Sequence, residues 1–224
     1  LEEQAFCGGF PWIEHPDDTE NASSKGVPRG LVLSPRMRKL FHQTFSAGMK
    51  NPLERPGVAE WRDVLYWAAK ATLKCPECGA TYFFINRNCP WCDRERPSYV
   101  VVRIGLEDGE TAPDKNPNKD FHDVAAAVLD ESESFFIDDT LGLGKPVAFE
   151  KNRFVEIALS GHKLQIRKIG DVAATLKTPG AACIEVGEKG KTLNMRENAT
   201  NGFLHLGDMN RLHRIIHFEF REGK

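Results

Sequence analysis

The first third of the chain combines a polar stretch with two segments that have apolar residues at helical spacing. Residues 1–33 are rich in Gly, Pro, Asn and Asp, which is typical of loops. Ser34 followed by Pro35 predicts a helix start, because Ser caps helices well and Pro fits their first turn. We expect Gly48 to close this helix and a second helix to run over residues 58–72. The apolar positions behind the two helices are Met37, Leu40, Phe41 and Phe45, and then Val58, Trp61, Leu65, Ala68 and Thr72.

The last third of the chain follows a two-residue period instead. Residues 154–159 and 163–169 are the clearest predicted strands, and a turn at 160–162 joins them. Turn signals recur at short intervals, which predicts a small antiparallel β-sandwich or barrel. Further strands are expected at residues 183–186, 203–206 and 215–220.

The middle of the chain mixes both patterns. Residues 81–85 and 99–104 are β-prone, and residues 105–119 have the composition of a linker. Phe121, Val124, Ala125, Val128 and Leu129 predict a compact amphipathic helix. The expected fold class is α+β, in four parts: a helical segment at 1–73, a zinc-ribbon-like module at 74–104, a linker and short helix at 105–133, and an antiparallel β domain at 134–224.

Composition narrows the classes of function. The 224 residues carry 30 Lys plus Arg and 32 Asp plus Glu, so the net charge is −2. A near-neutral chain has no global reason to bind nucleic acid or an anionic membrane. No apolar run approaches the ~18 residues that a bilayer crossing needs. The segment after Leu1 is acidic and unlike a secretory signal, so we expect a cytoplasmic piece of a longer protein.

Four of the six cysteines form two pairs with metal-ligand spacing. Cys75-Pro76-Glu77-Cys78 is followed, ten residues later, by Cys89-Pro90-Trp91-Cys92. Two such pairs are typical of a tetrahedral zinc site, in which backbone N–H groups support the sulfurs. Gly79 suits the tight reversal after the first pair. Because all four positions would be filled by protein, we expect a structural Zn²⁺ at Cys75, Cys78, Cys89 and Cys92, and no catalysis by the metal.

Disulfides or a redox-active pair fit these cysteines less well than a zinc site does. Two disulfides would need an oxidising compartment, and a thioredoxin-type pair needs only one Cys-x-x-Cys after a strand. Iron in a rubredoxin-like site has the same ligand chemistry and stays open. Cys7 and Cys183 stand alone in the sequence, and we expect buried or semi-buried thiols there.

Residues about 5–70 resemble the end of the C-lobe of a eukaryotic-like Ser/Thr protein kinase. The resemblance rests on the run 33–45 with its Ser-Pro start, on Asn51-Pro52-Leu53-Glu54-Arg55-Pro56, and on Glu60-Trp61. Gly9-Phe10-Pro11-Trp12, Glu20-Asn21 and Gly26 resemble the segment before it. Joined to the double Cys-x-x-Cys, the chain is similar to the C-terminal part of bacterial kinases from tellurite-resistance-like stress operons.

The resemblance implies a regulatory, metal-binding module of a kinase, phosphatase and von Willebrand factor A (VWA) triad, which docks on the VWA-domain protein. A cognate Ser/Thr phosphatase is a further implied partner. The Gly-rich loop, strand Lys, His-Arg-Asp and Asp-Phe-Gly motifs of a kinase are missing from the sequence. The fragment is therefore expected to bind no ATP and to be no enzyme. In the family, the counterpart of Arg55 pairs with an upstream Glu, so Arg55 needs another partner here or stays solvated.

A few side chains are candidates for partner contacts. Trp91 lies inside a knuckle, and Tyr82, Phe83 and Phe84 lie between the knuckles, where they contact a partner or pack against the neighbouring helix. A VWA metal ion accepts an outside carboxylate, for which the candidates are Asp17, Asp18, Glu107, Asp108, Asp138 and Asp139. For any one of these carboxylates, an ordinary solvated charge is the interpretation that we favour.

Two other classes of function stay open. A zinc-ribbon nucleic-acid binder would use Lys74, Arg87, Arg94 and Arg96, although Glu77, Asp93 and Glu95 dilute this patch. His205, His213 and His217 could suggest a metal site, but they have no single clean spacing and fit core or surface positions. A hydrolase or redox enzyme lacks an identifiable nucleophile and base.

Overall fold

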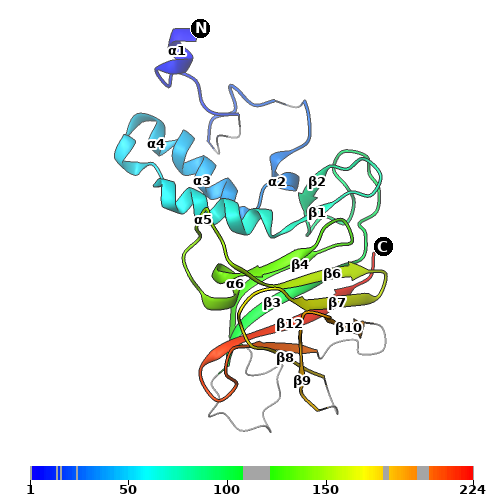
Figure 1. Cartoon of the computed structure of the whole chain (residues 1–224). Coiled ribbons are helices and arrows are strands. Elements are labelled where there is room, and N and C mark those ends of the chain that lie inside the picture. Colours follow the sequence, from blue (N-terminus) through cyan, green and yellow to red (C-terminus); the bar gives the residue numbers. More distant parts are fainter. Residues whose placement is uncertain are drawn as a thin grey trace.

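The computed structural model describes residues 2–13, 15, 17–23, 25–107, 122–178, 182–195 and 202–223. The protein is mixed α and β, with a helical layer, a small hairpin and two antiparallel sheets (Figure 1). The helices are α1 (Glu2–Phe6), α2 (Arg29–Val32), α3 (Pro35–Phe45), α4 (Ala47–Lys50), the 3-10 turn η1 (Pro52–Glu54), α5 (Val58–Ala69) and α6 (Asp139–Leu143). Within the described ranges, no helix has both the length and the apolar character that a membrane span requires.

The strands of the hairpin and of the two sheets follow in chain order. They are β1 (Thr72–Lys74), β2 (Thr81–Phe83), β3 (Tyr99–Glu107), β4 (His122–Leu129), β5 (Phe135–Asp138), β6 (Arg153–Ser160), β7 (Lys163–Lys168), β8 (Ala174–Lys177), β9 (Ile184–Glu185), β10 (Lys191–Asn194), β11 (Phe203–Leu206) and β12 (His213–Arg221). One sheet has the order β10-β7-β6-β5 and the other β4-β3-β12-β11-β8-β9. Buried side chains of both sheets belong to one core, so the strands form a two-layer sandwich.

The helical layer begins where the sequence predicts it. Ser34 caps α3, and its hydroxyl accepts a hydrogen bond from the Met37 N–H at 3.3 Å. The helix ends at Phe45 with Ser46 as its C-cap, rather than at Gly48, which lies buried inside α4. The Arg55 Nε donates to the Gly48 carbonyl at 2.6 Å, so Arg55 does find a partner within the chain.

The predicted apolar stripe of α5 is wrong at two positions, while Trp61, Ala68 and Thr72 are half-buried. Val58 is 87% exposed and Leu65 is 48% exposed, whereas Tyr66 is buried. The reason is that α5 has two neighbours instead of one. Trp61 meets Phe41 of α3 edge to face, with 5.2 Å between ring centroids. The next turn of α5 turns Tyr66 into the core of the sandwich.

The helix predicted over residues 121–129 is also wrong, because residues 122–129 form strand β4. This strand pairs with β3 from Val100–Leu129 to Leu106–His122. Three consecutive alanines favour a helix locally, but pairing along β3 and burial of Ala127 and Leu129 outweigh that preference. The antiparallel sheets therefore include β3 and β4, and do not begin at residue 134. Most of the predicted linker lies outside the described residues.

A buried carboxylate joins the helical layer to the sandwich. The Asp138 side chain caps α6 by accepting from the N–H groups of Thr140 and Leu141, at 3.1 and 3.0 Å. It also accepts from the Tyr66 hydroxyl at 3.2 Å and pairs with the Lys151 ammonium at 3.7 Å. Burial, together with the charge of Asp138, raises the pKa of Tyr66 well above its usual value of 10. The Tyr66 hydroxyl therefore stays protonated and donates to Asp138.

We expect Asp138→Ala to lower the free energy of unfolding by about 3 kcal/mol, because a helix cap is lost and the buried Tyr66 hydroxyl loses its acceptor. Asp63→Ala is the control, since Asp63 forms only an exposed ion pair with Arg62 and should cost less than about 0.5 kcal/mol. Urea denaturation measures both changes. Equal losses in the two variants would contradict the role of Asp138.

Candidate metal centre

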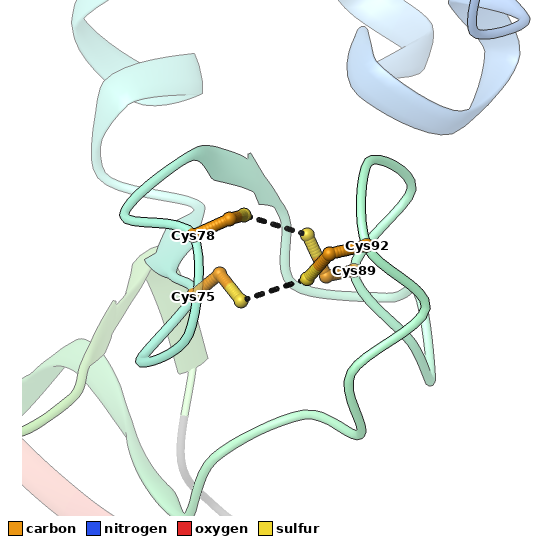
Figure 2. Close-up of side chains that lie close together, drawn as sticks. All are labelled: Cys75, Cys78, Cys89 and Cys92. Atoms are coloured by element: carbon orange, nitrogen blue, oxygen red, sulfur yellow. Dashed lines mark hydrogen bonds between the residues drawn. The ribbon is translucent and has the colours of Figure 1, made fainter.

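The four paired cysteines lie on two loops that the β1–β2 hairpin holds in place. Leu73 of β1 faces Tyr82 of β2 across the hairpin, and both side chains are 1% exposed. Cys75 follows β1 directly, and the second pair follows β2 after a turn. Figure 2 shows the two loops facing each other, with all four sulfurs directed into the space between them.

Both loops have the same backbone hydrogen bonds. The N–H groups of Cys75 and Cys89 donate to the carbonyls five residues ahead, those of Ala80 and Arg94, each at 2.8 Å. The N–H four residues after each of these cysteines donates back to its carbonyl, from Gly79 at 3.0 Å and from Asp93 at 2.9 Å. The backbone therefore builds two equivalent knuckles.

Each knuckle needs one residue in the left-handed region. Gly79 has φ 72°, as its position after the first pair predicts, and Asp93 has φ 59° at the equivalent place. The Asn88 amide donates to the Asp93 side chain at 2.9 Å and to its carbonyl at 3.1 Å. The sequence indicates Asp93 only as a negative charge near the knuckles, although Asp is one of the few residues that tolerate this conformation.

The sulfur positions suit one tetrahedral cation. All four Sγ atoms lie within 4.8 Å of one another, with 3.5 Å between Cys75 and Cys92 and 3.6 Å between Cys78 and Cys89 (Figure 2). Sulfurs bonded to one zinc at about 2.3 Å lie about 3.8 Å apart. A disulfide needs about 2.05 Å, so the four cysteines are free thiols. The residues fit a metal ion such as zinc.

One cysteine of each knuckle anchors the site and the other faces solvent. Cys75 and Cys89 are buried, and Cys78 and Cys92 are exposed. The two buried cysteines share a small core with Leu73, Tyr82, Tyr99 and Val128. Tyr99 and Val128 belong to β3 and β4, so the four-cysteine site packs against the larger sheet.

The surroundings of the sulfurs favour the loss of one proton first. Burial raises the pKa of Cys75, but N–H donors of Cys78 and Glu77 and the neighbouring thiols outweigh it and lower the pKa to about 7. Cys92 accepts from the Arg94 N–H, which lowers its pKa, yet burial and the other three thiols raise it to about 12. Because one ionised sulfur disfavours the ionisation of the thiols beside it, a cation that binds here has to displace the protons of those thiols.

The aromatic candidates divide into packed and exposed rings. Tyr82 is buried, and Phe84 packs on Tyr99 with 6.3 Å between ring centroids. Trp91, inside the second knuckle, is 49% exposed. Of the basic candidates, Arg96 is engaged internally, because it donates to the Phe84 carbonyl at 3.1 Å and lies over the Tyr99 ring.

The acidic candidates are spread over the molecule. Asp17 and Asp18 are exposed, and Asp108 lies outside the described residues. Asp138 and Asp139 are buried, and Asp138 serves the internal contacts described above. Glu107 lies beside His205 and His213, a grouping that no motif in the sequence predicts. Their sheet register could not be read from spacing.

The two single cysteines are exposed thiols. The expectation that Cys7 and Cys183 are buried or semi-buried is wrong for both. Neither residue belongs to the metal-ligand clusters found in the described part of the chain. The first lies just after α1 and the second just before β9, so both are in connections rather than in the core.

We expect Gly79→Ala to weaken zinc affinity about fivefold to thirtyfold, because a Cβ in the left-handed region costs about 1–2 kcal/mol. No atom lies within 4 Å of the added Cβ, so the cost is conformational. Gly187→Ala is the control, since Gly187 has equal space and no left-handed φ. Competition with a chromogenic zinc chelator gives both affinities. Unchanged affinity in Gly79→Ala would contradict the view that zinc binding holds Gly79 in its left-handed turn.

No protein-family model, no curated protein and no solved structure matches the chain.

Proposed function

We propose that the chain is a zinc-stabilised, non-catalytic interaction module that docks on a protein partner through the second cysteine knuckle. The observation that carries this proposal is the convergence of four sulfurs within 4.8 Å on two facing knuckles. Four protein ligands leave a tetrahedral zinc no open position for water or substrate, which is typical of structural sites. The metal therefore orders the knuckles.

The exposed knuckle supplies the surface for docking. Trp91 lies between two ligands, Cys89 and Cys92, and half of its side chain is open to solvent. Large aromatic residues supply much of the binding energy in protein interfaces. Because its neighbours on both sides are fixed by the metal, the backbone of Trp91 is ordered before binding, which lowers the entropic cost of association.

The proposed partner is a VWA-domain protein of a kinase, phosphatase and VWA system. The resemblance of residues about 5–70 to a kinase C-lobe supports this choice of partner. A carboxylate offered to the VWA metal ion would come from exposed positions, and Asp17 and Asp18 meet that requirement. Asp138 and Asp139 do not, because both side chains are buried.

Nucleic-acid binding has weaker support. Lys74, Arg87 and Arg94 are exposed around the knuckles, but so are Glu77, Asp93 and Glu95. A binding surface for phosphates is dominated by positive charge, and this one is mixed. Single-stranded RNA and DNA therefore serve as competing ligands in the test below.

We expect Trp91→Ala to weaken binding to the VWA protein about thirtyfold, the effect of a hot-spot residue worth about 2 kcal/mol. Calorimetry with the zinc-loaded chain measures the affinity. Phe149→Ala is the matched control, because Phe149 is a fully exposed aromatic residue that lies away from the knuckle, between α6 and β6. It should change the affinity less than about twofold.

Three results would contradict the proposal. The zinc-loaded chain fails to bind the VWA protein at high micromolar concentrations, or Trp91→Ala and Phe149→Ala have equal effects. The third is a salt-dependent affinity for single-stranded nucleic acid that Trp91→Ala removes, which would assign the knuckle to the alternative function.

A further inference from the structure

The larger sheet brings two histidines and a glutamate from three strands together, in a cluster that contains none of the paired cysteines. Glu107 ends β3 and His213 begins β12, and the two residues are direct partners across the strands. His205 of β11 lies opposite Ile215, two residues along from His213. Because side chains two residues apart share a face, all three lie on the face opposite the shared core, to which Leu204 and Ile216 point.

The three side chains converge within bonding distance of one point. His205 Nδ1 and His213 Nε2 are 2.8 Å apart, and Glu107 Oε2 lies 3.1 Å from the first and 3.3 Å from the second. Ligands bonded to one zinc at about 2.05 Å in a tetrahedron lie about 3.3 Å apart. An ion therefore needs the group to open by only a few tenths of an ångström.

When both imidazoles are neutral, the protons of this group are too few for its acceptors. His213 Nδ1 lies 2.8 Å from the Arg211 carbonyl, which can only accept, so this nitrogen carries the proton. A neutral His213 then presents a lone pair from Nε2 toward His205 and Glu107. The single proton that a neutral His205 can place on Nδ1 cannot serve both this lone pair and the Glu107 carboxylate.

Burial makes this shortage costly. Both imidazole side chains are 3% exposed, whereas Glu107 is 42% exposed. The other ring nitrogen, His205 Nε2, is also buried and has no hydrogen-bond partner among the described residues.

We propose that Glu107, His205 and His213 bind a second divalent transition-metal ion, through Glu107 Oε2, His205 Nδ1 and His213 Nε2. The hydrogen bond from His213 Nδ1 to Arg211 is the outer-shell contact that orients a ligating imidazole. Three protein ligands leave a position open for water or an external ligand, unlike the four-cysteine centre. His217 is not part of the site, because it stacks on Phe203.

The test uses the full chain with its cysteine site already filled by one equivalent of zinc. Titration with further zinc, followed by calorimetry, should show a second equivalent. Glu107→Gln should weaken this second affinity at least about tenfold, and His213→Gln should remove it. Glu185→Gln, on β9 of the same sheet, is the control and should leave it unchanged.

The half-exposed position of Glu107 keeps the test decisive even if a substitution of a buried histidine impairs folding. A second equivalent that weakens in Glu107→Gln and not in Glu185→Gln supports the site. The proposal is overturned if the zinc-loaded chain takes up no second equivalent at high micromolar zinc. It is overturned equally if Glu107→Gln and Glu185→Gln bind that equivalent as the unaltered chain does.

Discussion

Four thiols held within 4.8 Å of one another are the constraint on which the cysteine knuckles depend. Thiolates at this separation repel one another and neutral thiols hydrogen-bond only weakly, so the four sulfurs themselves favour a cation between the two loops. Metal binding in small zinc modules supplies about 10–16 kcal/mol. The β1 and β2 strands have only three residues each, so a bound cation would add substantially to the stability that the hairpin gives the loops.

The metal centre is continuous with the rest of the protein. Cys75 and Cys89 pack with Tyr99 and Val128, and the Lys74 N–H donates to Asp130 at 2.7 Å just beyond β4. The Val128 N–H donates to the Lys70 carbonyl at the end of α5, which in turn is tied to the sandwich through Tyr66 and Asp138. The sandwich thus serves as the base of the cysteine loops, and the β1–β2 hairpin that carries them lies above it in Figure 1.

The sequence predicted what local spacing determines. Features that depend on nearby residues were predicted correctly. They are the Ser34 cap, the turn at Gly161 and the two Cys-x-x-Cys motifs, which are only ten residues apart. Residues 122–129 were misassigned because their strand is stabilised by β3, more than fifteen residues away, against a local preference of three alanines. The exposed face of α5 was misassigned for a similar reason, since a helix with two neighbours has no single apolar stripe. Glu107, His205 and His213 meet only through the register of β3, β11 and β12, which no motif records.

X-ray absorption at the zinc edge, on the chain loaded with a single equivalent of zinc, tests the central claim most directly. The account predicts a first shell of four sulfur atoms at about 2.3 Å, lost when Cys75 and Cys89 are replaced by serine. A shell of nitrogen or oxygen atoms at about 2.0 Å, or a chain that retains no zinc while its cysteines are reduced, would contradict it.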